Sequence, residues 1–570
     1  MRVTFVHAPE PLYADTQNYG AQFMPVWAYT LASHLPSSEG FKVDLFDSRY
    51  ESFSSLNEAD LFLFSGINQD FSNLLRVAKK IKEKFPLARI VLGGPIAWSF
   101  DQAGDLEALS DFDFIFIGDG EELIAGYLAS IVSENPPPRV FRNMKRFDMD
   151  DSLVLNRELI QKSIHNYYGA VVEVSRGCPF LCEFCDIRIL NDNNRPHNKP
   201  ANLIVQEFDH FASLGVTSIL LACDNFIGDL AWANHVLDEI LAWQKKSNKK
   251  VSLYTWLTIT LRNQPDLMEK MRLAGFDMLF IGVESFEVNS LLETAKLQNT
   301  SADSLVEAIK YIQSFGFVVV GGLIFGFDSD SEKSFQSTLD GLENSGMLSG
   351  DPSLLTALPG TPLFRRMKLA GRLRNVRYGL GGYKYQTNML YLLPAEKIIS
   401  GYKHFITTFT SGSYQFKRLE NFIQNLDSGN YIPLNRTGYG NPKNFVKLLV
   451  KNPAAVAQLM LRLIRFAGRP SRIFWVAKGA KLLLSNPNRR HFFGYFQFWI
   501  FAWSNAVLKY SKLSETDFDI ASVEGPITRE KILPDGYTKD FQENIPIAKT
   551  NAQVRATSNQ LEKLIESRGL

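Results

Sequence analysis

Residues 171–187 read VVEVSRGCPFLCEFCDI, and this stretch decides the fold because an apolar strand runs directly into a loop with three cysteines. Cys178, Cys182 and Cys185 follow the spacing C-x3-C-x2-C. Thiolates are soft ligands that suit zinc or an iron–sulfur cluster. Zinc sites usually take four ligands in two close pairs, and the fourth cysteine of the chain, Cys223, has no neighbouring cysteine. The triplet therefore indicates a 4Fe–4S cluster with one iron left open for a substrate; three structural cysteines or a zinc knuckle are the alternatives.

The low cysteine content also points to a metal or catalytic role. The chain has 570 residues and only four cysteines, three of which lie within eight residues. This excludes a disulfide scaffold and predicts a reducing compartment. The first residues, MRVTFVHAPEP, lack the long apolar run of a signal peptide, so we expect a cytoplasmic protein. The length favours three or four domains.

Strands alternate with helices around the cysteine loop. We expect strands near residues 170–175, 217–222, 251–260, 277–283, 317–325 and 352–357, with helices in the intervals. Six such units predict a partial (β/α)6 barrel over residues 141–390, whose reactive groups stand at the carboxyl ends of the strands. Beyond about residue 390 the strand pattern stops. This predicts a mostly helical extension over 391–513 and a polar, partly disordered tail over 514–570.

Residues 1–140 form a separate α/β region that ends in a Pro-rich linker, NPPPRV, at 135–140. Its predicted strands, RVTFVHA, KVDLFD, DLFLFSG, RIVLGG and DFIFIGDG, are apolar enough to be buried on both faces, with helices near 24–35, 70–84 and 121–132. The pattern predicts a Rossmann-like domain with a parallel sheet. Ligands of such sheets bind beyond the carboxyl ends of the strands, where glycine turns allow close approach. The candidate ligand-binding turns contain Ser65, Gly66, Gly93, Gly94 and Gly118; a ligand-free domain is the alternative.

The cysteine loop after the first barrel strand resembles the signature of the radical S-adenosylmethionine (SAM) superfamily. The resemblance implies that the open iron binds the methionine part of SAM and that one electron then releases a 5′-deoxyadenosyl radical. Further positions match the family's SAM contacts in the same order along the chain: Phe184 beside the adenine, then Asp224 and Asn225, then Glu284 and Ser285, then Gly322, Ile324 and Gly326. The family's usual Gly-Gly-Glu is absent at the second strand, so the contact to the methionine amino group is not assigned to one residue there.

Two further residues at strand ends could take part in chemistry, but a structural role is expected for both. Cys223 ends an apolar strand, where a cysteine is expected to be a small buried residue, with radical quenching as the alternative. His7 ends the first strand and is expected to be a hydrogen-bonded turn residue rather than a ligand.

A Rossmann-like domain before such a barrel resembles the cobalamin-binding class of radical SAM enzymes, the class B methyltransferases. Within that class, SRGCPFLCEFCDI, CDNFIG, GVES, KLQNT, GFDSD and ALPGTPLFRRMKLAGRL are similar to the subgroup that contains hopanoid C-2 methylase. The resemblance covers about residues 1–390 and implies that cobalamin binds at the turns of the first domain and carries a methyl group to a substrate radical. The motif D-x-H-x-x-G, which supplies a histidine ligand to cobalt, is absent from residues 1–150, so no residue compels cobalamin to bind.

A strongly basic segment is hidden by the net charge of +1. Between Asp427 and Glu515 there are fourteen Lys and Arg residues and no acidic residue. Within residues 441–513 they alternate with apolar and aromatic residues at helical spacing, and the longest uncharged stretch, 492–508, is short for a membrane span. This favours helices that lie on an anionic membrane surface. A helical cap with apolar core faces is the alternative; nucleic-acid binding fits so apolar a segment poorly.

The leading hypothesis is a cobalamin-dependent radical SAM enzyme that methylates an unactivated carbon of a hydrophobic, lipid-like or isoprenoid-like small molecule. Its cofactors are a 4Fe–4S cluster, SAM and cobalamin, with a flavodoxin or ferredoxin as electron donor. The alternatives are a radical cyclase, carbon–carbon coupling or oxidation without methyl transfer, and a cluster-bearing sensor or scaffold. We expect no nucleic-acid partner, and a cytoplasmic location with peripheral contact at the inner membrane face.

Overall fold

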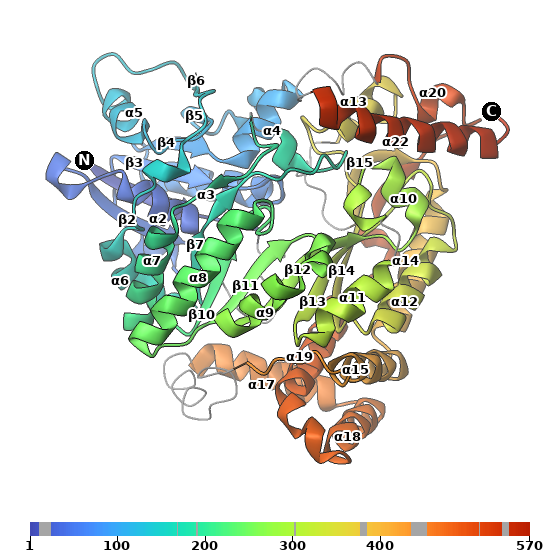
Figure 1. Cartoon of the computed structure of the whole chain (residues 1–570). Helices are drawn as coiled ribbons and strands as arrows, with labels where there is room; N and C mark the ends of the chain where they lie inside the picture. The colour runs from blue at the N-terminus through green and yellow to red at the C-terminus, as the bar shows by residue number, and fades with distance from the viewer. Residues whose placement is uncertain are drawn as a thin grey trace.

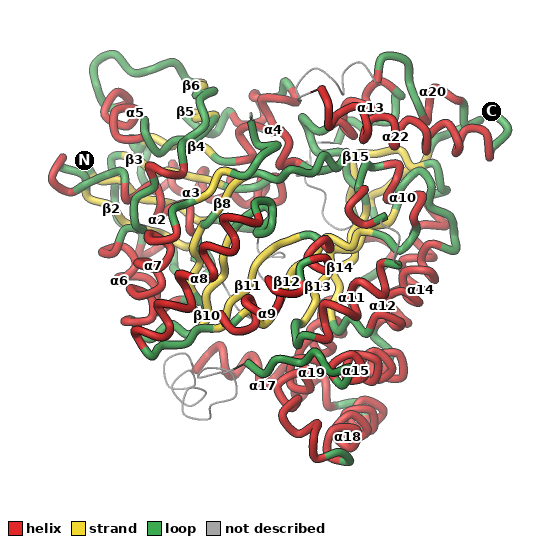
Figure 2. The backbone as a smooth tube through the Cα atoms, viewed as in Figure 1, coloured by secondary structure: helices red, strands yellow, loops and turns green. Residues whose placement is uncertain are grey.

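The structure is a computed structural model that describes residues 1–10, 24–167, 169–189, 192–300, 304–376, 385–434, 453–511, 513–537 and 547–570. Two six-stranded sheets dominate these residues, one near the N-terminus and one in the middle of the chain, and helices cover both (Figure 1). The tube in Figure 2 shows the strands of the central sheet running side by side, with helices along their outer side.

The N-terminal sheet is parallel, with the strand order β2–β1–β3–β4–β5–β6. Its strands are β1 Arg2–His7, β2 Lys42–Asp47, β3 Leu61–Ser65, β4 Arg89–Gly93, β5 Phe114–Ile117 and β6 Val140–Arg142. The helices between them are α2 Val26–Ser33, α3 Phe71–Lys84, α4 Pro95–Ala103 and α5 Ile124–Ile131. Helix α3 shows why these segments are helical, because Leu74, Val77, Ala78 and Ile81 recur at helical spacing and are all buried. The predicted Rossmann-like α/β fold is confirmed.

One strand of this sheet was not expected and begins at the end of the predicted linker, 135–140. β6 begins at Val140, the last residue of the Pro-rich segment, and pairs with β5 through Ile115. The ring of Phe141 then packs 5.2 Å from the rings of both Phe116 and Tyr127. The packing of this half-buried ring against two aromatic side chains explains why the chain leaves the linker as a strand.

The central sheet is also parallel, and its order β14–β13–β12–β11–β10–β7 follows the order of these strands along the chain. The strands are β7 Ala170–Glu173, β10 Ser218–Ala222, β11 Ser252–Leu257, β12 Phe276–Glu284, β13 Val318–Phe325 and β14 Ser349–Leu354. The helices between them include α7 Ala201–Ser213, α8 Leu230–Ser247, α9 Pro265–Ala274, α10 Val288–Glu293, α11 Leu305–Ser314 and α12 Ser334–Ser345. This confirms the predicted partial barrel. The last strand starts three residues earlier than expected and includes Pro352, which an edge strand tolerates.

The C-terminal part is mostly helical, as expected, but it also contains two strands. Its helices are α13 Pro362–Leu369, α14 Ala395–Phe409, α15 Gly412–Leu426, α17 Pro453–Ala467, α18 Pro470–Leu484, α19 Phe493–Tyr510, α20 Arg529–Ile532 and α22 Ile547–Ser567. β15 Gln386–Tyr391 pairs in parallel with β16 Asp519–Ser522. The described residues after 513 therefore return to the barrel instead of forming a disordered tail, because Ile532, Leu533, Tyr537, Leu561 and Ile565 share a buried core with Leu392.

The aromatic helix α19 belongs to the core. Trp499 and Trp503 are fully buried and pack with Leu419 and Phe422 of α15 against Val318 at the start of β13. This places α19 at the amino ends of the barrel strands, at the opposite end of the molecule from α22 (Figure 1). Within the described residues, every helix is too short or too polar to cross a membrane.

Candidate active site

The cysteine loop leaves the barrel after β7 and is closed at its base by a short antiparallel pair. β8 Ser175–Arg176 pairs with β9 His197–Asn198, so the loop begins and ends at neighbouring points. Gly177 has a φ of 93°, and a Cβ atom there would lie 2.1 Å from the backbone oxygen of Arg195. Glycine is therefore required at the entry to the loop. The backbone N–H of Cys178 donates to the backbone oxygen of Asn193 (3.0 Å), which fixes the first cysteine.

The three thiols lie close enough that the charge of one affects the pKa of another. Cys182 is buried, while Cys178 and Cys185 are half-buried. Burial raises the pKa of the Cys178 thiol to about 12, and the pKa of Cys185 is raised by burial, by Asp186 and by the other two cysteines. Three thiolates so close together would repel one another without a metal. Bound iron removes this penalty, because its positive charge stabilises the deprotonated sulfur atoms. The described residues hold no group of three His, Cys, Asp or Glu placed for a single metal ion; in a cubane each thiolate binds its own iron. The donor set fits a 4Fe–4S cluster.

A second segment, residues 294–299, contacts each of the residues Cys182, Glu183 and Phe184. The amide of Gln298 donates to Cys182 Sγ at 3.4 Å, and the N–H of Glu183 donates to the backbone oxygen of Thr294 at 2.8 Å. The Nζ of Lys296 lies 5.8 Å from the centre of the Phe184 ring.

No site role was predicted for residues 294–299, although they overlap the KLQNT stretch of the family resemblance, residues 296–300. A contact between residues 116 positions apart leaves no local pattern, so the only available signal was that resemblance.

Asp224 and Asn225, at the end of β10, lie beside the entry of the cysteine loop. Asp224 Oδ2 accepts a hydrogen bond from the N–H of Gly177 at 2.6 Å, and burial raises the pKa of Asp224 to about 6. The side chain of Asn225 is buried, and both its amide oxygen and nitrogen lack a partner within the described residues. An unpaired buried amide is costly unless a ligand satisfies it. Asn225 is therefore better placed than Asp224 to contact a bound polar molecule.

Glu284 and Gly322 come together on neighbouring strands of the barrel. Glu284 has a φ of 62° at a register shift between β12 and β13, and its Oε1 accepts a hydrogen bond from Lys296 Nζ at 2.7 Å. A Cβ on Gly322 would lie 3.5 Å from Glu284 Oε2. Ser285 is buried, and its Oγ accepts from the N–H of Glu287 at 3.0 Å.

The predicted adenine-pocket residues partly converge. The ring of Phe184 lies 6.4 Å from the ring of Phe327, which directly follows Gly326. Gly326 has a φ of 101°, and a Cβ there would lie 2.5 Å from the Tyr391 ring. Ile324 is half-buried two residues before Gly326. Assignment of these residues to SAM stays a prediction.

Cys223 has ordinary structural partners. Its sulfur lies 3.3 Å from Thr255 Oγ1 and 3.5 Å from the backbone oxygen of Trp256, to which the thiol donates. Burial raises the pKa of this thiol to about 12. These contacts agree with the expectation of a buried strand-end residue, and radical quenching stays a prediction.

The candidate cobalamin turns of the N-terminal domain pack against one another. A Cβ on Gly94, whose φ is 81°, would lie 2.3 Å from Ser65 Oγ and 3.3 Å from Gly66 N. A Cβ on Gly118 would lie 2.0 Å from the backbone oxygen of Asn143, whereas Gly93 has more room. Close backbone packing alone therefore explains the glycines at 94 and 118, and cobalamin binding by these five residues stays a prediction.

Buried polar atoms without a partner gather at the carboxyl edge of the same sheet. Among the described residues these include Nδ1 of His7, the last residue of β1, Asn68 Oδ1 after β3 and Glu121 Oε2 after β5. Burial and the charge of Arg49 lower the pKa of His7 to about 4, so His7 is neutral near pH 7. The backbone oxygen of His7 accepts a hydrogen bond from the N–H of Ser48 at 3.0 Å, as expected of a turn residue, but Nδ1 has no partner within the described residues. Unsatisfied polar atoms along one edge fit a large polar ligand such as cobalamin.

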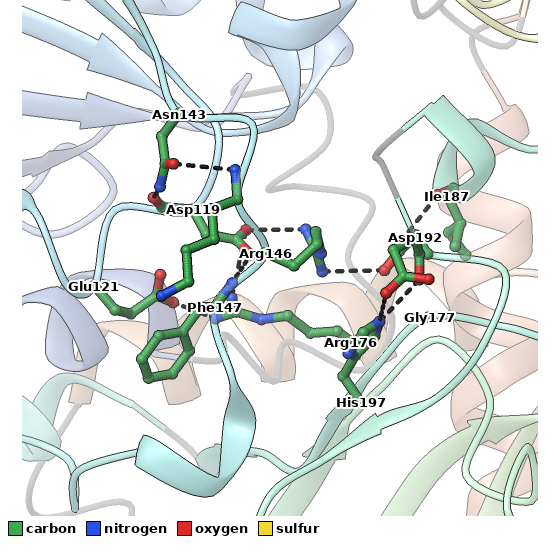
Figure 3. Close-up of polar contacts among 12 residues, drawn as sticks. Asp119, Glu121, Asn143, Arg146, Phe147, Arg176, Gly177, Ile187, Asp192 and His197 are labelled. Carbon is green, nitrogen blue, oxygen red and sulfur yellow. Dashed lines mark hydrogen bonds and ion pairs between the residues drawn. The ribbon is translucent and has the colours of Figure 1, made fainter. Parts of the chain in front are cut away.

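The carboxyl edges of the two sheets are joined by an ionic network (Figure 3). Asp119, in the turn after β5, accepts from Arg146 Nη1 at 3.0 Å and from the N–H of Phe147 at 2.8 Å. Arg146 Nη2 in turn donates to Asn193 Oδ1 at 3.1 Å. Arg176, at the entry to the cysteine loop, pairs with Glu121. The N-terminal domain is thus connected through Asn193 to the backbone of Cys178.

A polar surface cavity of about 640 Å³ lies close to this region but is separate from the cysteines. It is bordered by residues around β9 and the first turns of α7 and α8, including Lys199, Trp232 and His235. Its lining contains none of the predicted site residues.

Comparison with known proteins gives matches of three kinds. The radical SAM superfamily matches residues 172–342, and a domain of unknown function (DUF4070) matches residues 361–515. Hopanoid C-2 methylase of Rhodopseudomonas palustris (strain TIE-1) is 28% identical over 405 residues, which are 70% of this chain and 73% of that protein. Anaerobic magnesium-protoporphyrin IX monomethyl ester cyclase of Synechocystis sp. is 24% identical, and the match covers 52% of this chain and 61% of that protein.

A solved structure extends the likeness to the whole chain. The cobalamin-dependent S-adenosylmethionine radical enzyme OxsB, with aqua-cobalamin and S-adenosylmethionine bound, superposes with a TM-score of 0.55 at 14% identity. The superposition covers 99% of this chain and 83% of that one. Residues 172–342, which begin within the first barrel strand and contain the cysteine loop, are thus a radical SAM domain, and the chain as a whole has the fold of OxsB.

Proposed function

We propose that this radical SAM enzyme methylates an unactivated carbon of a hydrophobic small molecule and that it uses cobalamin to do so. The observation that carries the proposal is the contact between the carboxyl edges of the two sheets, through Asp119, Arg146, Asn193 and Arg176. Ligands of parallel sheets bind at this edge. A ligand on the N-terminal sheet and a cluster on the barrel would therefore face one another across a single site.

Each group of residues has a distinct task in this proposal. Cys178, Cys182 and Cys185 hold the cluster, and Asn193 keeps the first of them in place. Asn225 offers both its donor and its acceptor to SAM, and Glu284 is held in position by Lys296. When they are bound, the cluster and SAM supply a carbon-centred radical and cobalamin supplies a methyl group. The protein orients these groups and excludes water.

A hydrophobic substrate is supported by the relative that is named a hopanoid methylase. Peripheral membrane contact is supported by the exposed side chains of α17, α18 and their neighbours. Met460, Leu461, Ile464, Ile473, Phe474, Leu484 and Phe493 are seven of the twenty large apolar residues that are exposed in the described part of the chain. Arg465, Arg469, Lys478 and Lys481 are exposed on the same two helices and their junction, and such basic, apolar surfaces bind anionic lipid. Residues 441–452 of the predicted membrane segment lie outside the described residues.

Helices α17 and α18 lie far from the cysteine loop, which restricts the role that a membrane contact could have. α18 lies at the end of the barrel opposite α22, near the amino ends of the strands, whereas the cysteine loop follows a carboxyl end (Figure 1). We infer that α17 and α18 would anchor the enzyme to a membrane rather than pass substrate directly into the site.

A second candidate function is radical ring formation or oxidation without methyl transfer. The cyclase relative favours it, because the match to it covers 52% of this chain at 24% identity. The two candidates need the same radical generator, so their products must distinguish them.

The test is anaerobic reconstitution of the full chain with iron, sulfide, cobalamin and SAM, followed by analysis of a lipid extract and of the SAM products. Methylation predicts both S-adenosylhomocysteine and 5′-deoxyadenosine, together with a lipid heavier by one methylene. Deoxyadenosine without any methyl transfer would reject methylation and favour the second candidate. Cys182→Ala should abolish both SAM products, whereas Cys223→Ala should retain the cluster because Cys223 lies outside the triplet.

A further inference from the structure

Glu183, between two of the cluster cysteines, carries a buried charge that the proposed function does not use. Its side chain is fully buried. Both carboxylate oxygens accept from Arg366, with Arg366 Nε at 2.7 Å from Oε1 and Nη2 at 3.1 Å from Oε2. Its backbone oxygen accepts from the N–H of Leu363 at 3.1 Å. Helix α13 thus holds the cysteine loop at its centre.

Arg366 is itself fixed by a second buried carboxylate. Arg366 Nη1 donates to Asp328 Oδ2 at 2.6 Å, and Asp328 also accepts two hydrogen bonds from Arg372, at 2.6 and 2.9 Å. All four side chains of this network are almost completely buried. A bidentate arginine between two carboxylates fixes their relative geometry more strictly than a lysine can.

The remaining donors and acceptors of the network come from the C-terminal segment. The hydroxyl of Tyr537 donates to Glu183 Oε1, and its ring lies 5.9 Å from the Arg366 guanidinium. The backbone oxygen of Ile532 accepts from Arg366 Nη1 at 3.3 Å, and that of Lys531 accepts from Arg372 Nη1 at 3.0 Å. These residues lie more than 340 positions after the cysteines.

Several independent contacts anchor this segment to the barrel. Arg374 Nη2 pairs with Asp519 of β16 at 2.6 Å. Leu561 and Ile565 of α22 are buried with Ile532, Leu533 and Tyr537. Helix α22 packs against α10 at the end of the barrel that carries the cysteine loop (Figure 1). The segment is therefore held on both sides of Tyr537.

We propose that the C-terminal segment, residues 513–537 and 547–570, is a structural part of the cluster site. Tyr537, through Glu183, and the carbonyl groups of residues 531 and 532, through Arg366 and Arg372, hold the cysteine loop in its cluster-binding conformation. They act as positioning groups and do not touch the cluster. This inference rests on the radical SAM assignment and is independent of whether the reaction is a methylation.

The first test is Tyr537→Phe in the full chain, with Tyr414→Phe as the matched control. Tyr414 is also buried, and its hydroxyl donates to the backbone oxygen of Leu339 at 2.6 Å, away from the cysteine loop. After reconstitution, the rate of iron release to a chelator and the EPR spectrum of the reduced cluster are measured. We expect Tyr537→Phe to release iron several-fold faster with altered g-values, and Tyr414→Phe to match the wild type in both. Equal release rates and spectra for both variants would overturn the inference.

The second test uses Arg366→Lys, with Arg272→Lys as its control. Arg272 is also buried, and it donates to the backbone oxygens of Phe276 and Ile432 at the amino end of the barrel. If the loss of a buried guanidinium fork only weakens the fold, both variants should have lower melting temperatures and normal iron retention, which would contradict the proposal. The proposal predicts that only Arg366→Lys releases iron rapidly. Neither readout depends on methyl transfer, so failure here is distinguishable from failure of the proposed function.

Discussion

Gln298 donates from its side-chain amide to the sulfur of Cys182, and the amide oxygen of Gln298 has no partner within the described residues. Reduction adds negative charge to a cluster and its thiolates, and a hydrogen bond from a neighbouring donor stabilises that charge. Lys296 lies two residues before Gln298 and adds a buried positive charge, which Glu284 partly neutralises. Both residues therefore bear on the reduction potential of the cluster.

We predict that Gln298→Leu lowers the midpoint potential of the cluster by tens of millivolts, because the reduced thiolate loses a donor. Potentiometric titration followed by EPR measures this directly. Gln313→Leu is the matched control, since the buried amide of Gln313 donates to the backbone oxygen of Ser345 and not to a cysteine. A potential unchanged in Gln298→Leu, or shifted equally in both variants, would show that the Cys182 contact has no electronic effect.

Asp330, which follows the end of β13, should make the stability of the fold depend on pH. It accepts from Ser290 Oγ and from the N–H groups of Gly326 and Phe327, and burial raises its pKa to about 6. Because this pKa is higher than in the unfolded chain, the folded state binds the extra proton between about pH 4 and 6 and loses it as the pH rises. Stability should therefore fall by at most about 3 kcal/mol over this window. Asp330→Asn should remove this contribution, as measured by unfolding of the two proteins at pH 4.5 and 7; parallel pH profiles would disprove it.

Individual site residues differ in how far the sequence could predict them. The cysteine triplet is local, so its spacing alone indicated a cluster. Gln298, Arg366 and Tyr537 act on the same loop from 116, 183 and 354 positions away from their partners, and no periodicity records such contacts. Asn225 was predicted, together with Asp224, from the family resemblance, and only the burial of its unpaired amide distinguishes it from Asp224.

At the scale of helices and strands, the apolar periodicity predicted both sheets, because parallel strands are buried on both faces. The periodicity could not decide where a helix lies when the same pattern suits both a membrane surface and a protein core. The stretch 492–508 reads equally as a membrane-surface helix or a core helix, and Trp499 and Trp503 of α19 are in fact fully buried. β16 was not expected because its four half-buried residues show no strand alternation, and only its pairing with β15 makes it a strand.

Helices α17 and α18 give a prediction about membrane contact. Ile464 and Phe474 are 62% and 59% exposed, so replacing both with Ser should leave the fold intact and remove apolar area available to lipid. We expect the double variant Ile464→Ser, Phe474→Ser to bind phosphatidylglycerol vesicles several-fold more weakly in a flotation assay. Leu87→Ser is the control, because Leu87 is 96% exposed on the N-terminal domain. Equal flotation of all three proteins would remove the support for an anchoring surface.

At the scale of the whole molecule, the arrangement of domains matters more than any single motif. A continuous core runs from Val3 and Tyr29 of the N-terminal domain to Val171 and Leu221 of the barrel, so the two domains are packed as one body. The sequence predicted both folds but not their relative placement, because the contacts among Asp119, Arg146, Asn193 and Arg176 join segments with no shared pattern. That placement makes the two carboxyl edges neighbours.

The most direct test of this arrangement is the magnetic interaction between cob(II)alamin and the reduced cluster in the reconstituted full chain. Two paramagnetic centres in one site shorten each other's relaxation, so the cob(II)alamin EPR signal should become harder to saturate when the cluster is reduced. We predict this change in the wild type and its loss in Cys182→Ala, which cannot hold the cluster. A cob(II)alamin signal that saturates identically with oxidised and reduced cluster would contradict a shared site between the two sheets.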